Sequence, residues 1–184
     1  VIVLYAWFLP ALVEKFGVLM AMGDWEQAVE TAQRVLAQDQ HNIEALRLSV
    51  LFLLSQESRV SLAVSRVSDL QQALDRHEPQ NAALYIRIAR PFARLAGRQE
   101  DVLKVTQALA ERACRLAPHK AEYAAEAAYQ QMLAGDLHGA AGRLRQAGVM
   151  EEGSSEVMAH QIKCQVLSGQ LDEVPPPPAP HLPP

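Results

Sequence analysis

Apolar side chains recur three and four positions apart through most of the chain, as Val67, Leu70 and Leu74 illustrate. This spacing places them on one face of an α-helix, whereas no segment alternates apolar and polar residues long enough to predict a strand. The pattern therefore predicts an all-α fold. The expected helices cover about residues 9–22, 25–38, 43–56, 60–76, 82–96, 100–116, 121–134, 137–148 and 155–168.

Turn-forming residues separate these helices in a repeated order. Gly23-Asp24 and Gly135-Asp136 each lie between two expected helices, and defined positions follow each pair at successive spacings of five, seven and five. These positions are Ala28, Val35 and Gln40 in the first unit, and Ala140, Ala147 and Glu152 in the second. The last spacing recurs a third time, from Ala113 to Pro118. The chain is therefore built from internal repeats.

The turns that close these units give the repeat length. Gln40, Pro79, Pro118 and Glu152 mark them and lie 39, 39 and 34 residues apart. A period of about 34 residues is that of the tetratricopeptide repeat, a hairpin of two antiparallel helices, and one extra helical turn accounts for the longer intervals. The sequence thus predicts a tetratricopeptide-type α-solenoid of about four to five repeats over residues 1–174.

The residue types suit this interpretation. A Gly-Asp pair permits the backbone angles of a tight turn, small residues let helices approach closely, and Pro ends a helix because it lacks an N–H group. Three features depart from the pattern. Gln40 and Glu152 replace Pro, the turn near residues 56–58 has no Gly, and Pro91 falls inside an expected helix, which must either bend there or end earlier.

The two ends of the chain differ from the repeats. The apolar start, residues 1–9, is too short to span a bilayer and lacks the basic flank of a signal peptide, so we expect part of a buried helix and no membrane insertion. The absence of an initiator Met indicates that the sequence begins inside a longer protein. Residues 175–184 are nearly all proline and predict an extended, solvated tail, which serves as a linker or, alternatively, as a ligand for an SH3 or WW domain.

Composition narrows the possible partners. The net charge is −4 and the pI about 5.9, which argues against binding to nucleic acid or to an anionic membrane. The two cysteines, Cys114 and Cys164, are 50 residues apart and are expected to pack as small buried residues in a reducing, intracellular setting.

No arrangement of residues indicates catalysis. Three of the six histidines lie at turns between repeats, and none pairs with a metal-ligand residue at the required spacing on one helix. Gly135, Gly139 and Gly142 lack the Lys and Ser or Thr of a phosphate-binding loop, and no serine has a partner base. We therefore expect no enzyme activity, catalytic residue, cofactor, metal or small-molecule substrate.

One surface feature points to a binding site. Arg87, Arg90 and Arg94 are three and four positions apart and share one face of an expected helix, the first of its hairpin. First helices line the groove of such a solenoid, so these guanidinium groups are candidates to bind acidic side chains of a partner protein. The alternative is a solvated face held by salt bridges to neighbouring helices.

Several longer segments carry a more specific resemblance. They are the run Asp24–Leu36 with the following Gln38-Asp39, residues 42–47, residues 78–82, the stretch from Leu109 to Pro118, and residues 165–171. In order and spacing they resemble the tetratricopeptide repeat protein 21 family, over roughly residues 9–173. That family is the long repeat subunit of the intraflagellar transport A complex. The resemblance implies a structural role beside other subunits of that complex, in retrograde ciliary transport, ciliary cargo entry and cilium assembly. It also implies a location in the cilium, the basal body region and the cytoplasm.

Other functions of such repeats stay open at this point. A generic adaptor or a co-chaperone module that grips peptide C-termini would need a clamp of Lys, Asn and Arg, and the aligned positions here carry Leu, Ser, Glu and Ala as often as basic residues. A third possibility is a substrate-recruiting region of a larger enzyme. RNA-reading helical repeats are disfavoured by the net negative charge.

Overall fold

The computed structural model describes residues 8–57 and 59–169, and within these ranges the regular structure is helical. Residues 1–7 of the expected apolar start and the proline-rich tail lie outside the described residues and stay predictions. The helices are α1 (Leu9–Met22), α2 (Trp25–Gln38), α3 (Ile43–Phe52), the π-helical turn η1 (Leu53–Glu57), α4 (Val60–His77), α5 (Ala82–Ala96), α6 (Glu100–Leu116), α7 (Ala121–Leu133), α8 (Leu137–Met150) and α9 (Ser155–Ser168).

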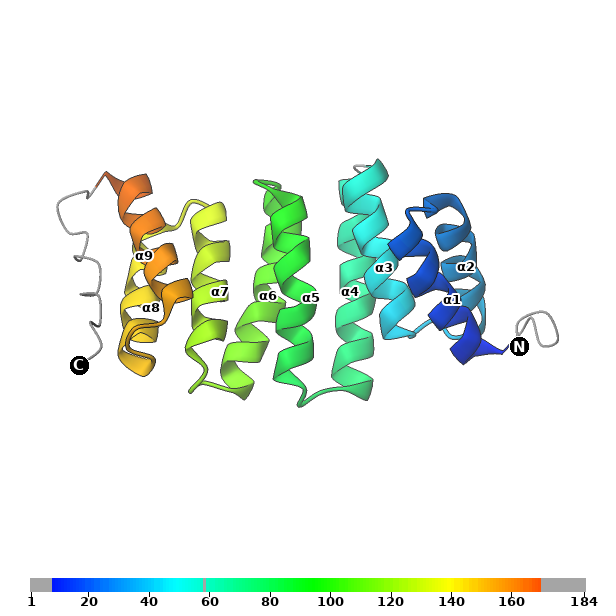
Figure 1. Cartoon of the computed structure of the whole chain (residues 1–184), viewed down its shortest axis with the longest axis horizontal. Coiled ribbons are helices and arrows are strands. Elements are labelled where there is room, and N and C mark those ends of the chain that lie inside the picture. The colour runs from blue at the N-terminus through cyan, green and yellow to red at the C-terminus, as the bar shows by residue number, and fades with distance from the viewer. Residues whose placement is uncertain (1–7, 58, 170–184) are drawn as a thin grey trace, which may run out of the picture.

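Consecutive helices pair as antiparallel hairpins, α1 with α2, α3 with α4, α5 with α6 and α7 with α8, and α9 packs against α7 and α8. The hairpins stack side by side into an elongated array that runs from the N-terminal to the C-terminal end (Figure 1). Each unit therefore contacts its neighbours in the sequence, which is the arrangement of an α-solenoid. The predicted all-α, tetratricopeptide-type fold is confirmed.

The turns form as the sequence predicts. Gly23 and Gly135 adopt left-handed backbone angles, with φ of 76° and 89°, at the inner turns of the first and fourth hairpins. The aspartates that follow cap the next helices: Asp24 Oδ1 accepts from the N–H of Gln27 at 3.2 Å, and Asp136 Oδ1 accepts from that of Gly139 at 2.9 Å. Capping satisfies backbone N–H groups that have no partner inside the helix.

Two expectations about helix boundaries have different outcomes. The expected helix 43–56 instead ends as an α-helix at Phe52 and continues as the π-helical turn η1. The segment lacks a glycine for a left-handed cap, so the chain leaves the helix through a wider turn. Pro91 does lie inside a helix, because α5 is continuous across it, so the predicted boundaries of α5 are correct.

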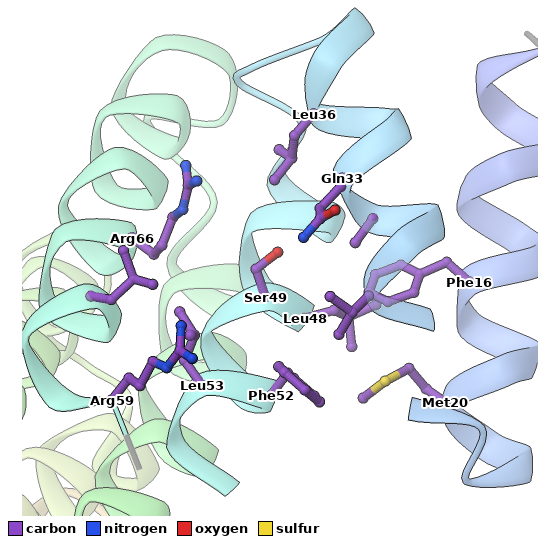
Figure 2. A pocket seen from close by; sticks show the side chains of 13 residues that line it. Phe16, Met20, Gln33, Leu36, Leu48, Ser49, Phe52, Leu53, Arg59 and Arg66 are labelled. Atoms are coloured by element: carbon purple, nitrogen blue, oxygen red, sulfur yellow. The ribbon is translucent and has the colours of Figure 1, made fainter. Parts of the chain in front are cut away.

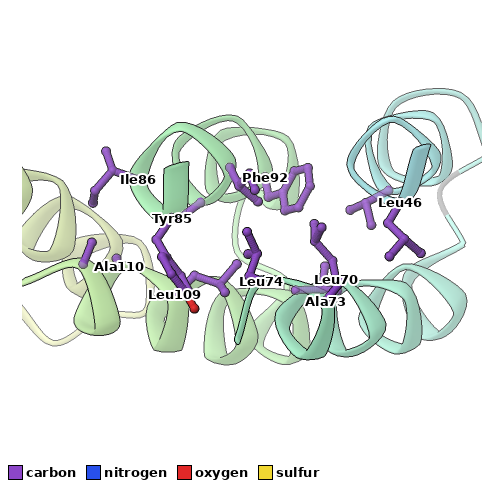
Figure 3. Close-up of a cluster of buried hydrophobic side chains, with 14 of the residues drawn as sticks. Leu46, Leu70, Ala73, Leu74, Tyr85, Ile86, Phe92, Leu109 and Ala110 are labelled. Atoms are coloured by element: carbon purple, nitrogen blue, oxygen red, sulfur yellow. The ribbon is translucent and has the colours of Figure 1, made fainter. Parts of the chain in front are cut away.

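The core lies between two layers of helices. Leu46 of α3 and Tyr85 and Phe92 of α5 come from one layer and meet Leu74 of α4 and Leu109 of α6 from the other, and all five are fully buried (Figure 3). The small and apolar repeat positions are likewise inaccessible to solvent. These positions are Ala28, Val35, Ala113, Ala140 and Ala147. Close approach of helices at these sites explains why the repeat spacing is kept.

The cysteines are both free. Cys164 is buried and Cys114 is half-buried, so the expectation that each thiol is buried is met in full by Cys164 and in part by Cys114. Burial raises the pKa of both thiols, chiefly through loss of hydration.

Candidate functional site

The three arginines singled out from the sequence lie on α5, on the side of the helix opposite its buried residues Tyr85, Ile88 and Phe92. Their environments differ. Arg87 is exposed and makes no ion pair with any described residue, whereas Arg90 and Arg94 are engaged by carboxylates from other helices. The structure therefore separates one free guanidinium group from two that are held.

Arg90 joins three helices. Its Nη2 atom lies 2.9 Å from Glu122 Oε1 on α7 and 3.3 Å from Glu156 Oε1 on α9, and its Nε atom lies 3.1 Å from Glu126 Oε2 on α7. Burial on its own would lower the pKa of Arg90, but Glu156, Glu126 and Glu122 together raise it. The guanidinium group thus stays charged and connects the third, fourth and fifth repeat units.

Arg94 completes the arrangement through a two-point contact with the same carboxylate. Its Nη1 and Nη2 atoms donate to Glu126 Oε1 and Oε2 at 2.8 and 2.9 Å. Nη1 also donates to the main-chain oxygen of Arg90 at 2.9 Å, within α5. Paired N–H···O bonds of this kind fix the relative orientation of the two groups as well as their distance.

Glu126 is the centre of this cluster. Its side chain is 0% exposed, and it accepts hydrogen bonds from Arg90, Arg94 and, at 3.0 Å, the side-chain amide of Gln130. A buried carboxylate is stable only when charged partners replace its hydration, and loss of a partner from a buried pair costs about 3–5 kcal/mol. Glu126 is therefore a fixed part of the structure, unavailable to an external ligand.

An aromatic platform lies beside this cluster. The ring of Tyr129 on α7 has Arg94 and Lys163 each at 4.7 Å from its centroid, and the ring of His160 lies 5.1 Å away. Cations at this distance from a ring face are attracted by its electron density. We define the acidic, basic and aromatic side chains of this face as the Arg–Glu cluster: Arg90, Arg94, Glu122, Glu126, Tyr129, Glu156, His160 and Lys163.

The sequence of the chain matches known proteins of one family. The family model described as "Tetratricopeptide repeat protein 21 second ARM domain" matches residues 65–175. Mouse tetratricopeptide repeat protein 21B is 40% identical over 173 residues, which is 94% of this chain, and the human protein of that name is 39% identical over the same length. The chain belongs to the tetratricopeptide repeat protein 21 family.

The related proteins of this family are much longer than the chain. Its match spans 13% of the length of mouse and human tetratricopeptide repeat protein 21B, and the same share of mouse tetratricopeptide repeat protein 21A, which is 35% identical over 166 residues. The activities and partners of a whole family member are therefore a matter for proposal in this chain.

Solved structures with the same fold have little sequence in common with this family member. Among them is PilW, a type IV pilus biogenesis factor, with a TM-score of 0.67 and 15% identity over 94% of this chain and 76% of its own. Another is YrrB, a tetratricopeptide repeat protein with an unusual peptide-binding site, with a TM-score of 0.61 and 14% identity over 92% of this chain and 82% of its own. Family and fold together support a repeat-based scaffold for protein interaction.

The acidic half of the Arg–Glu cluster was not identified in the sequence of this family member. Its residues lie far along the chain from α5: the Arg90 contacts reach Glu122 and Glu126, 32 and 36 positions away, and Glu156, 66 positions away. These offsets are close to one and two repeat lengths. A search for opposite charges about 34 positions apart, where successive repeats come into contact, is the signal that would have found them.

Two histidines lie close together outside the Arg–Glu cluster. The ring centroids of His41, in the turn after α2, and His77, at the end of α4, are 6.5 Å apart, a proximity that the sequence did not suggest. No group of three or more potential metal ligands occurs among residues 8–57 and 59–169. None of the helices in these ranges is long and apolar enough to cross a membrane.

Proposed function

We propose that this chain is a section of the tetratricopeptide subunit of the intraflagellar transport A complex, where it binds other subunits as a non-catalytic scaffold. Its role would be to support retrograde ciliary transport, ciliary cargo entry and cilium assembly, in the cilium, at the basal body and in the cytoplasm. The observation that carries the proposal is the 40% identity to tetratricopeptide repeat protein 21B over 94% of the chain.

The structure suggests how a partner would be held. Stacked hairpins present a continuous surface, and the odd-numbered helices α5, α7 and α9 carry the Arg–Glu cluster along one face. Because carboxylates of α7 and α9 already pair with Arg90 and Arg94, we propose that Arg87 is the arginine of the three that is free to pair with a carboxylate of a partner. The other two would orient the surface without contacting the partner's charge.

This division of roles determines the experiment. The full chain is used as bait for affinity capture and mass spectrometry from ciliated-cell extract, beside the variants Arg87→Glu and Arg98→Glu. Arg98 is also exposed, so its reversal changes the net charge equally away from the cluster. We expect intraflagellar transport A subunits with the wild-type bait, and recovery lowered by a factor of about two to five in Arg87→Glu alone, as for one exposed ion pair.

One outcome would contradict the proposed family role, and another would contradict only the proposed Arg87 contact. If a bait with an intact helical circular dichroism spectrum recovers chaperones or unrelated proteins instead, the chain is a generic adaptor or a co-chaperone module. If Arg87→Glu and Arg98→Glu both recover the transport subunits as well as the wild type does, the family role stands and Arg87 is not the contact.

A further inference from the structure

A cavity opens between the first and second hairpins, remote from the Arg–Glu cluster. Its volume is about 160 Å³, and it lies between α1 and α2 on one side and α4 on the other, with α3 behind it (Figure 2). Apolar side chains make most of its wall: Phe16, Met20, Val29, Ala32, Leu36, Leu48, Phe52, Leu53 and Leu62. A volume of about 150 Å³ is enough for one benzene ring.

The local sequence explains why the cavity exists. Ala32 and Ser49 present small side chains to it, and η1 begins directly behind it at Leu53. Between the second and third hairpins, by contrast, Ala73, Leu74 and Leu109 belong to a core cluster without exposed surface.

The charged residues in the described lining of the cavity are arginines. Arg59 and Arg66, at the start and in the second turn of α4, line it, whereas the acidic Asp69 lines the adjoining groove. Arg66 and Asp69 are both half-buried, and their contact is a long one of 3.4 Å, which contributes little. An occupant with a carboxylate beside its apolar group would thus complement the wall.

The cavity continues into a polar groove between α2 and α4, which shares Gln33, Leu36 and Arg66 with it. The groove has a volume of about 370 Å³, and Gln40 and Gln72 add further side-chain amides to its lining. Amide groups both donate and accept hydrogen bonds, as the main chain of an extended peptide requires.

We propose that this seam binds a short extended peptide of a partner protein, with one large apolar side chain in the cavity and a carboxylate beside it against Arg66. Charge complementarity and the size of the cavity identify the occupant's chemistry. The site lies on hairpins one and two, apart from the Arg87 contact proposed above.

The test uses defined peptides. Acetyl-Gly-Phe-Glu-Glu-Gly-amide is titrated into the full chain to about 10 mM and followed by NMR, beside versions with Ala in place of Phe and Lys in place of both Glu. We expect shifts in the signals of Leu48, Ser49 and Leu62, and affinity at least about tenfold lower for the Ala peptide, since a buried aromatic side chain is worth about 1.5–3 kcal/mol. The Lys peptide should bind about five- to tenfold more weakly, as expected for loss of a charge-assisted hydrogen bond.

Two variants with matched controls locate the binding. Ser49→Leu fills the cavity, and the Ser49 hydroxyl donates only to Ala45 O in its own helix, so the fold should be kept. Ser68→Leu is its control, because Ser68 makes the same kind of bond to Val64 O at an exposed position outside the lining. Arg66→Glu should lower affinity about fivefold, whereas the equal charge change Lys104→Glu on α6 should not.

Four results would overturn the proposal. The first two are equal affinities of the parent peptide and its Lys version, and no signal shifts at the cavity with the parent peptide at the highest concentration. The third is an unchanged affinity of the parent peptide for folded Ser49→Leu, and the fourth is a concentration-dependent dimerisation of the chain that is lost in Ser49→Leu. The last would assign the cavity to a second copy of the chain.

Discussion

At the scale of single residues, the arginines of α5 show how one sequence pattern can hide two roles. Arg87, Arg90 and Arg94 have equivalent spacing, yet Arg90 and Arg94 are bound to the buried Glu126 and Arg87 is exposed. Periodicity gives the face of a helix, but it does not give the residues that face it from another repeat. The basic stripe was therefore predictable, and its internal partner was not.

His160 provides a test of this environment through its titration. Burial lowers the pKa of His160 from its ordinary value of 6.5. The carboxylates of Glu156 and Glu126 oppose this shift, and Arg94 and Lys163 add to it. The unfolded chain thus takes up a proton at a higher pH than the folded one. The contribution of His160 to the free energy of unfolding is therefore full above about pH 7.5 and is lost as the pH falls through 6.5 toward the lowered pKa.

We expect this pH dependence in urea unfolding of the wild type between about pH 5 and 8, and a smaller slope in His160→Gln. His138→Gln serves as the control, because His138 is exposed on α8. The same slope in both variants would show that His160 is not the titrating group.

At the scale of helices and turns, the first and fourth hairpins use one device at their inner turns. A left-handed glycine ends the first helix, and Asp24 or Asp136 caps the second by accepting a main-chain N–H. Asp24 Oδ2 also accepts from the side-chain amide of Gln27 at 2.7 Å. The two caps therefore act locally and independently.

We expect Asp136→Ala and Asp24→Ala each to lower the unfolding free energy by about 1 kcal/mol, as for loss of a helix cap. Replacement of either aspartate by Asn should keep most of the stabilisation from the cap, since the amide oxygen still accepts the main-chain hydrogen bond. Chemical denaturation measures the loss, and amide exchange at Gly139 and Gln27 locates it. Equal destabilisation by Ala and Asn would mean that charge at the helix start is responsible instead.

The same scale shows what local sequence could predict. Helices bounded by Gly-Asp, Asn or Pro were predicted to within two residues, as α2 and α5 show, because each of these residues fixes the backbone at its own position. The π-helical end of α3 was missed, since residues 53–57 contain no such signal and their path depends on packing against α4. The cavity beside it was missed for the same reason.

At the scale of the whole molecule, stability is a sum of hairpins and of the seams between them. The seams differ: an apolar core joins the second and third units, whereas Arg90 joins α5 through charge to the buried Glu126 of α7 and to Glu156 of α9. A solenoid of this kind loses cooperativity where a seam is weakened.

Glu126→Gln is expected to weaken the charged seam. It removes the anion that Arg90 and Arg94 share, while Glu122 and Glu156 still pair with Arg90. The unfolding free energy should fall by about 1–3 kcal/mol, less than for a fully buried pair because both guanidinium groups reach water. Hydrogen exchange should increase together in α5, α7 and α9 and stay unchanged in α1 and α2. Glu111→Gln, which loses the half-buried pair with Arg143 between α6 and α8, is the control and should cost less than about 1 kcal/mol. An increase in exchange confined to α7 would refute the role as a link between units.

The balance of charge in the Arg–Glu cluster also bears on how partners arrive. Three cations, Arg90, Arg94 and Lys163, face the three anions Glu122, Glu126 and Glu156, so at a distance greater than about 10 Å their fields largely cancel. Apart from the single charge of Arg87, ionic attraction across solution then has little to act on, and encounter with the Arg–Glu cluster proceeds near the slower rate of unsteered diffusion. Selectivity at this surface is exerted after contact, through the fixed directions of its donors and acceptors.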